Sequence, residues 1–127
     1  MNHDDANTTT RAAALDKLTP ENAAFLPIDY MHGLISAARS IEPGELRNNA
    51  VALAKIARLF GLPAVGTGDT TGRTWMGAEM GEISEVLPDM PVFPRTTVSA
   101  WEWPEYREAV EPRAFSRILT AWKARTR

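Results

Sequence analysis

Short apolar stretches alternate with helix-forming stretches along this chain, and that alternation limits the folds open to it more than any other feature. Four stretches have the length and composition of β-strands, at residues 23–28, 64–67, 91–94 and 116–122. Helical patterns lie at residues 45–60, at residues 78–87 and from Pro104 onward. Strands that alternate with helices across short connections are typical of a parallel sheet with helices on its faces. We therefore predict an α/β fold.

The segment Glu45–Phe60 carries the clearest helical pattern. Its apolar residues recur every three or four positions, which places them along one side of a helix: Leu46, Ala50, Leu53, Ile56 or Ala57, and Phe60. Pro43 suits the first turn of a helix, and Gly61 followed by Pro63 is typical of a helix end. Because amphipathic helices usually pack against a core, we interpret this helix as scaffold.

Pro27 disturbs the first predicted strand. The continuous apolar run from Ala23 to Ile28 indicates a strand that is covered on both faces. Proline cannot donate a backbone hydrogen bond to a neighbouring strand. Either the strand is distorted at Pro27 or its assignment as a strand is wrong.

Length and charge exclude several classes of protein. A chain of 127 residues suffices for one domain, which we place at residues 20–127, after a polar arm at residues 1–19. The net charge of −2 and the lack of a basic stretch interleaved with aromatic residues argue against a nucleic-acid partner. No apolar run reaches the roughly 20 residues that span a bilayer, and the amino terminus does not resemble a secretory signal. We expect a cytoplasmic protein without membrane association.

The sequence offers little to bind a cofactor. It has no cysteine, and His3 and His32 lack the spacing of metal ligands, so we predict no metal site and no disulfide. The glycine-rich segment 66–77 matches neither of two common phosphate-binding templates, so no nucleotide cofactor is expected. We interpret Trp75, Trp101 and Trp103 as core or interface residues rather than as pocket walls.

Two charged residues stand where an open α/β sheet binds its ligands, just beyond the carboxyl ends of strands. Asp29 directly follows the first predicted strand, where a partly buried carboxylate could serve as a general base. A helix cap or a turn residue is the alternative for Asp29. Arg95 follows the third predicted strand and could hold an anion or pair with a carboxylate, or it is a solvated surface arginine. Spacing alone leaves these alternatives open.

Several separated stretches resemble the isochorismatase-like hydrolases, and in particular their YcaC-like branch. They occur in the family's order and extend over nearly the whole chain: Leu15–Lys17, Asn22–Tyr30, Gly33–Ile35, Arg39–Pro43, Asn48–Lys55, Leu87–Asp89, Arg95 and Ala100–Trp101. The resemblance implies a Rossmann-like, doubly wound parallel sheet with helices on both faces. It also implies hydrolysis of amide-type or related bonds by a triad of aspartate, lysine or arginine, and cysteine.

On this sequence the resemblance assigns the aspartate to Asp29 and the basic member to Arg95, while the catalytic cysteine is absent. Strands one and three of the implied order 3-2-1-4-5-6 lie about 10 Å apart, which a long arginine side chain can largely cover. Asp29 and Arg95 are therefore expected to meet. The chain stops about where the cysteine would follow the fourth strand, which implies a sheet shortened to about four strands in the order 3-2-1-4.

Three hypotheses about function follow. The first is a hydrolase-like protein that is catalytically incomplete without its cysteine. The second is a binding or assembly subunit that forms a homo-oligomer through the apolar sheet edge Phe115–Trp122, because unpaired strand edges associate readily. The third is an enzyme with unrelated chemistry that acts on a small-molecule ligand through Asp29, Arg95 or the segment Asp69–Arg73.

Overall fold

The structure is a computed structural model, and it describes residues 17–68 and 73–111. The polar arm up to residue 16, part of the glycine-rich segment and the predicted fourth strand at residues 116–122 lie outside these ranges. Within them, the chain forms a mixed α/β structure with a small parallel sheet. The predicted α/β class is thus confirmed.

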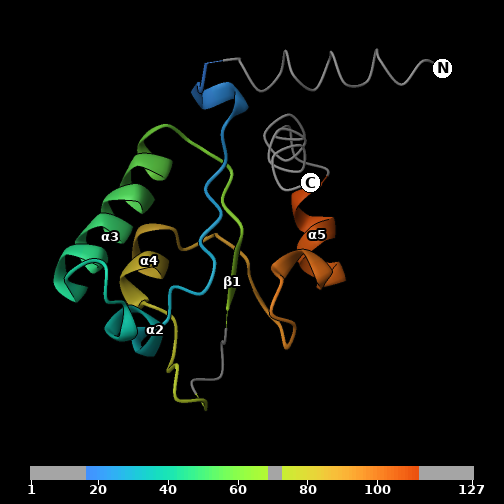
Figure 1. Cartoon of the computed structure of the whole chain (residues 1–127). Helices are drawn as coiled ribbons and strands as arrows, with labels where there is room; N and C mark the ends of the chain where they lie inside the picture. The colour runs from blue at the N-terminus through green and yellow to red at the C-terminus, as the bar shows by residue number, and fades with distance from the viewer. Residues whose placement is uncertain (1–16, 69–72, 112–127) are drawn as a thin grey trace, which may run out of the picture.

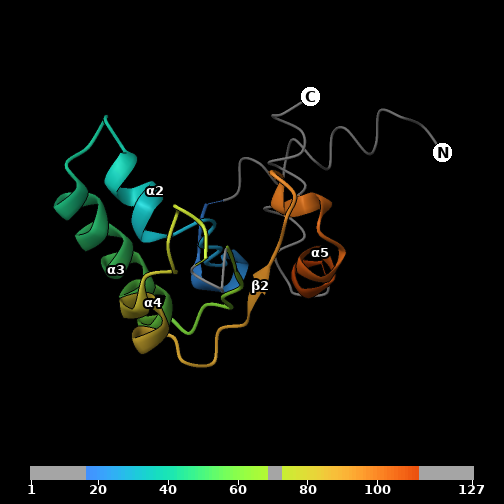
Figure 2. The same cartoon turned by 90° about the horizontal axis from the view of Figure 1, so that it is seen from below.

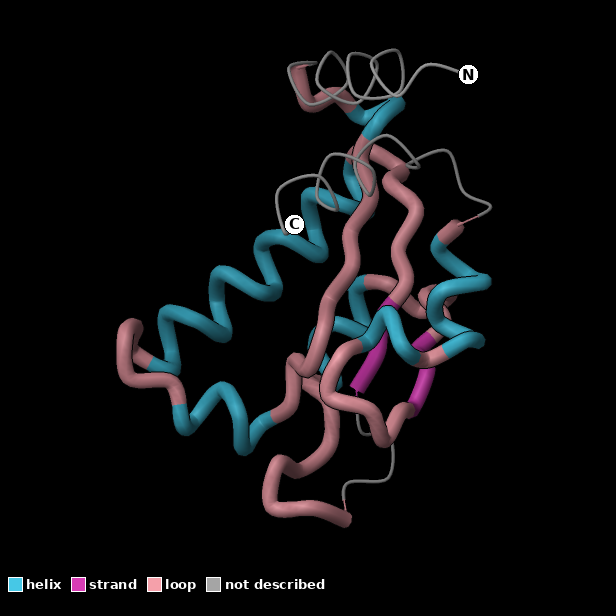
Figure 3. The backbone as a smooth tube through the Cα atoms, turned by 45° about the vertical axis from the view of Figure 1, so that its right-hand side comes forward, coloured by secondary structure: helices cyan, strands magenta, loops and turns pink. Residues whose placement is uncertain are grey.

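The sheet has two regular strands, β1 (Gly66–Gly68) and β2 (Val92–Pro94), which run parallel with Gly66 opposite Val92. The extended segment 25–28 lies along the other side of β1. It meets that side through two parallel bridges, Phe25 with Ala64 and Ile28 with Thr67. The spatial order is therefore β2, then β1, then segment 25–28. Figure 3 shows how short the strands are beside the long stretches of loop around them.

The predicted strand at residues 23–28 is not a regular strand, and Pro27 gives the physical reason. The Pro27 carbonyl accepts a hydrogen bond of 3.1 Å from the Thr67 amide, but proline has no N–H to return one. The pairing is accordingly reduced to isolated bridges at Phe25 and Ile28. The segment still keeps a parallel direction and a fixed register, so its carboxyl end lies beside that of β1.

Three helices pack on one side of the sheet: α2 (His32–Ala37), α3 (Pro43–Leu59) and α4 (Gly81–Val86). The predicted helix at residues 45–60 is confirmed as α3, but the predicted apolar stripe is not its buried face: Ala50, Ala54 and Ala57 are buried, whereas Leu53, Ile56 and Phe60 are exposed. Glu42 caps it by accepting a hydrogen bond from the Gly44 amide, and Gly61 follows its end with a left-handed φ of 64°. The buried residues of this side form one core cluster, which consists of Ile35, Ala50, Ala54, Met80 and Ile83.

Helix α4 begins later than the predicted helix at residues 78–87. Residues 78–80 are extended instead, because the Ala78 carbonyl and the Met80 amide are hydrogen-bonded to His32 and Tyr30, respectively. Met31 and Glu79 form an isolated antiparallel bridge between the same two segments. Helix α2, which the strand and helix patterns did not predict, begins at the end of this pairing.

A second core lies on the opposite side of the sheet, under the 3-10 helix η2 (Ala100–Glu102) and helix α5 (Pro104–Val110). Its buried residues are Val65, Ala100, Tyr106 and Val110. Figures 1 and 2 show α3 and α4 on one side of the strands and α5 on the other. Pro104 starts α5 as the sequence predicted. A short 3-10 helix, η1 (Pro20–Asn22), precedes the first extended segment.

Candidate functional site

Asp29 lies at the carboxyl end of segment 25–28, and its backbone holds an unusual conformation. Its φ of 60° is left-handed, a region in which Asp and Asn occur more often than most non-glycine residues. Two hydrogen bonds maintain this bend: the Asp29 amide donates to the Thr67 carbonyl at 2.9 Å, and the Met31 amide donates to the Asp29 carbonyl at 2.8 Å. The chain is thus turned out of the sheet directly at the carboxylate.

Arg95 follows β2 and forms a two-point ion pair with Asp29. Its Nη1 donates to Oδ1 of Asp29 at 2.7 Å and its Nη2 donates to Oδ2 at 2.6 Å. Nη2 also donates to the Val98 carbonyl at 3.1 Å. The Arg95 side chain is only 5% exposed, whereas that of Asp29 is 33% exposed. The two residues therefore meet at one sheet edge, and neither is a solvated surface charge.

Thr67, which the sequence reasoning did not single out, supports this pair from the middle strand. It is fully buried, and its hydroxyl donates to the Phe93 carbonyl at 2.7 Å while accepting a hydrogen bond of 3.4 Å from Nη1 of Arg95. A threonine that ends a predicted strand between two candidate charges was the available signal. The Arg95 Nε is buried and has no hydrogen-bond partner in the described ranges, so the guanidinium retains one unused donor.

The ion pair lies in the wall of a cleft of about 770 Å³ at the carboxyl edge of the sheet. Most of the wall is apolar, and the residues that line it are Asp29, Met31, Leu34, Gly68, Thr74, Met76, Pro94, Arg95, Thr96, Thr97, Val98 and Trp103. Small-molecule sites typically combine such an apolar wall with a few convergent polar groups. The cleft can therefore accept a small ligand of largely apolar character.

Glu79 is a second acidic residue at this edge, and the sequence reasoning missed it. Burial, together with the nearby charge of Asp29, raises the pKa of Glu79 to about 7. The Glu79 carboxyl lies against Gly68, where a Cβ would come within 2.7 Å of its Oε1. No local motif marks Glu79, because only the pairing of residues 78–80 with residues 30–32 carries it to the site.

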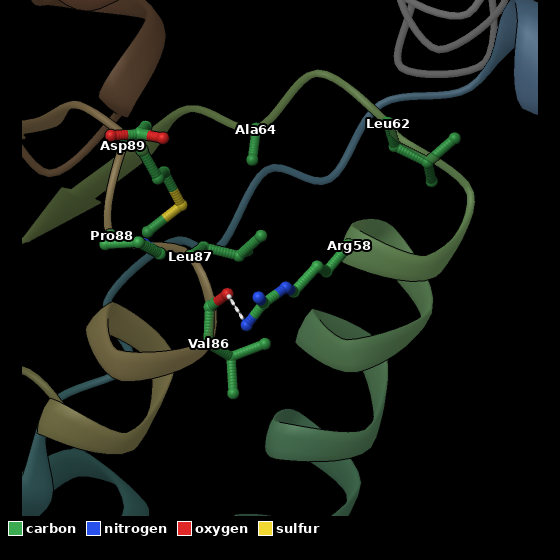
Figure 4. Close-up of a pocket in the computed structure, with 8 residues that line it drawn as sticks. Arg58, Leu62, Ala64, Val86, Leu87, Pro88 and Asp89 are labelled. Carbon is green, nitrogen blue, oxygen red and sulfur yellow. Dashed lines mark hydrogen bonds between the residues drawn. The ribbon is translucent and has the colours of Figure 1, made fainter.

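A smaller hollow of about 250 Å³ lies near the amino ends of β1 and β2, between the end of α3 and the segment after α4 (Figure 4). It also contains an arginine and an aspartate, Arg58 and Asp89. The Arg58 side chain points to the Val86 carbonyl, to which Nη1 donates a long hydrogen bond of 3.5 Å. Both charged residues are exposed. This hollow lacks the buried charge that distinguishes the cleft.

The remaining sequence candidates are distributed over the molecule. Trp101 and Trp103 pack against the second core, and Trp103 also lines the cleft, while Trp75 is 73% exposed. Of the glycine-rich segment, Gly66 and Gly68 form the ends of β1.

Among the described residues no cluster of three or more acidic, histidine or cysteine side chains could hold a metal ion. No helix in the described ranges has the length and apolarity needed to cross a membrane.

Comparison with known proteins supplies the evolutionary context. The chain matches no protein-family profile. It is 32% identical over 107 residues to the probable hydrolase YcaC of Escherichia coli K12, a match that covers 83% of this chain and 50% of the relative. The chain thus spans about half the length of the relative it matches.

Two solved structures share the fold. One is the crystal structure of the YcaC gene product of Escherichia coli, an octameric hydrolase of unknown specificity; its TM-score is 0.70 at 32% identity, over 76% of this chain and 47% of that one. The other is YcaC from Pseudomonas aeruginosa with hexane-2,5-diol and covalent acrylamide; its TM-score is 0.72 at 33% identity, over 77% and 48%. Sequence and structure therefore point to the same group of proteins.

Proposed function

We propose that this chain, which is similar to YcaC hydrolases, is a member of the YcaC-like branch of the isochorismatase-like hydrolases, and that it binds small amide-type ligands in the cleft beside Asp29 and Arg95 but does not hydrolyse them by itself. The observation that carries the proposal is the buried two-point ion pair between these residues at the carboxyl edge of the sheet. The family resemblance assigns the acidic and basic members of the catalytic triad to these two positions. Their role in catalysis is part of the proposal.

The missing thiol accounts for the second half of the proposal. The 127 residues contain no cysteine, and the family's chemistry depends on a cysteine thiolate as nucleophile. Loss of a nucleophile typically removes several orders of magnitude from the rate. We further propose a fourth strand at residues 116–122. Counted along the sequence, segment 25–28, β1 and β2 are strands one, two and three, so this strand would complete the order 3-2-1-4. The proposed domain covers residues 20–127 and follows an arm at residues 1–19.

The relative from Pseudomonas aeruginosa was solved with covalent acrylamide, so acrylamide is a suitable first ligand. We expect it to bind reversibly to this chain, to perturb NMR signals of Met31, Gly68 and Thr96 around the cleft, and to release no ammonia above the buffer rate. The matched variants are Asp29→Asn, which removes the carboxylate at the cleft, and Asp89→Asn, which removes the carboxylate at the smaller hollow. Ammonia release that Asp29→Asn abolishes would reveal another nucleophile, and a lack of signal changes at the cleft would refute ligand binding there.

A second candidate function, as a subunit of a homo-oligomer, is favoured by the outer face of α3. Four large apolar side chains there are exposed by 47% to 78%: Leu53, Ile56, Leu59 and Phe60. Contiguous apolar patches on a protein surface commonly mark interaction sites. The Escherichia coli relative is octameric, and a second copy of this chain is the partner we propose. The sheet edge Phe115–Trp122 that the sequence suggested as the interface lies outside the described residues.

Light scattering tests this assembly. The wild-type chain should be larger than a monomer at concentrations of tens of micromolar, and Leu59→Glu should shift it toward the monomer, because a charge would be buried in the contact. Asn48→Glu adds the same charge to the polar first half of α3 and should leave the size unchanged. A monomeric wild type, or equal effects of both variants, would refute this interface.

A further inference from the structure

The position of Glu79 is set by backbone pairing rather than by its own side chain. The Met80 amide donates to the Tyr30 carbonyl at 2.9 Å, and the His32 amide donates to the Ala78 carbonyl at 3.1 Å. These bonds hold residues 78–80 against residues 30–32, which directly follow Asp29. Glu79 is therefore fixed beside the cleft with little freedom to move its backbone.

The Glu79 carboxyl is placed over the end of β1. A Cβ added at Gly68 would lie 2.7 Å from Oε1 of Glu79, which is too close. The carboxyl therefore occupies space that is free because residue 68 is a glycine. Two neighbours of Glu79 line the cleft: Gly68, which ends β1, and Met31, which forms the isolated bridge with Glu79. No hydrogen bond or ion pair of the Glu79 carboxyl is found among the described residues.

The two carboxyl groups at this edge are in different chemical situations. Both oxygens of Asp29 accept hydrogen bonds from Arg95, so a cation engages the whole carboxyl group. Among the described residues, no cation pairs with the Glu79 carboxyl. Because Arg95 pairs with Asp29, while Glu79 lies near the Asp29 charge without a paired cation in the described ranges, a proton at this edge belongs with Glu79. The raised pKa of Glu79, about 7, agrees with this geometry.

We propose that Glu79, in its protonated form, donates a hydrogen bond to the carbonyl oxygen of an uncharged amide-type ligand in the cleft, while Asp29 remains paired with Arg95. This inference rests on the proposed function, because it names the group that recognises the ligand. No bond is made or broken in this step: the proton stays on Glu79 and the ligand leaves unchanged. The hydrogen-bond donor to the ligand is thus Glu79, and not Asp29, which the sequence put forward as a general base.

The test separates a donor from a general polar contact by its choice of ligand. N,N-dimethylpropionamide has a carbonyl acceptor and no N–H, so it can bind Glu79 only when Glu79 carries the proton. Its binding to the whole chain is followed by NMR between about pH 6 and about pH 8, and the Glu79 carboxyl carbon is titrated in the same samples. Since apparent affinity scales with the fraction of protein that is competent to bind, the affinity should fall about tenfold over this range.

Two variants complete the experiment. Glu79→Gln keeps a hydrogen-bond donor at the same place but does not titrate, so binding should persist and lose its pH dependence. Glu85→Gln removes an exposed carboxyl from the same region and should behave as the wild type does. An affinity of the wild type that does not change with pH, or a Glu79 midpoint near that of an ordinary glutamate, would overturn the inference and leave the proposed ligand site intact. Absence of binding at every pH would overturn the proposed function and this inference together.

Discussion

The cleft at Asp29 and the smaller hollow at Asp89 contain the same pair of residue types, an arginine and an aspartate, yet they differ in how these are held. In the cleft, the Arg95 side chain is 5% exposed and donates hydrogen bonds to both carboxylate oxygens of Asp29. In the smaller hollow, Arg58 lies at the surface at the end of α3 and donates a long hydrogen bond to the Val86 carbonyl. Composition alone thus does not define a site. Burial does, because a charge that is removed from water must be paired.

The largest expected difference between the hollows follows from removal of the acidic partner. Asp29→Asn leaves the Arg95 guanidinium buried without a counter-charge and should lower the free energy of unfolding by about 3 kcal/mol. Asparagine tolerates the left-handed backbone at this position, so the charge is the main change. Asp89→Asn at the exposed site should cost less than about 0.5 kcal/mol. Urea unfolding of both variants measures the contrast, and equal losses would contradict it.

Replacement of the arginine should have a smaller effect than replacement of its partner. Arg95→Met keeps much of the side-chain volume and leaves Asp29, which is 33% exposed, able to find water, so we expect a loss of about 2 kcal/mol. Arg58→Met at the surface removes one long hydrogen bond and should cost about 0.5 kcal/mol or less. A larger loss for Arg58→Met than for Arg95→Met in the same urea titration would invert the comparison.

The stability of the protein should also depend on pH through Glu79, beside the cleft. Because the pKa of Glu79 is raised from 4.5 to about 7 on folding, the folded protein binds more protons than the unfolded chain between these values. Stability from this group is therefore fully present below about pH 4.5 and declines as the pH rises to about 7. The full shift corresponds to about 3 kcal/mol, and partial exposure reduces our expectation to between about 1 and 2 kcal/mol.

Glu79→Gln should remove this decline and make the protein more stable than the wild type at about pH 8, with little difference at about pH 4.5. Thermal unfolding over that pH range provides the measurement. Glu85→Gln, with an exposed side chain, is the control and should not alter the slope. A wild-type stability that rises steadily from about pH 4.5 to about pH 7 and a variant with the same slope would contradict the assignment to Glu79.

The smallest effect concerns the two left-handed positions, Asp29 at the cleft and Gly61 after α3. Gly61→Ala should cost about 1 kcal/mol from backbone strain alone, since its Cβ would meet nothing within 4 Å. Asp29→Ala should be less stable than Asp29→Asn by a similar amount, for the same reason. The difference between the two Asp29 variants, compared with Gly61→Ala in one unfolding series, isolates the backbone contribution at the site. No difference would mean that residue 29 leaves the left-handed region when its side chain changes.

Local patterns along the chain were enough for several elements. The spacing of Leu46, Ala50 and Leu53, with Pro43 before them and Gly61 after, located α3 to within two residues at its start and one at its end. The strand at β2 and the start of α5 at Pro104 were located equally well. These features depend on side-chain periodicity and on the restricted backbone of proline and glycine, both of which act over a few residues.

The sequence also singled out Asp29 and Arg95, because each follows a predicted strand and matches the family motif. That their side chains meet was an expectation from the sequence. What only the tertiary structure decided is how the two groups are held: the two-point contact, the burial of Arg95 and the buried hydroxyl of Thr67 between them. Glu79 joined the site through hydrogen bonds between residues 78–80 and residues 30–32. Such long-range pairing leaves no local pattern, because backbone groups bond in the same way whatever side chain they carry, and burial of a carboxyl depends on everything that surrounds it.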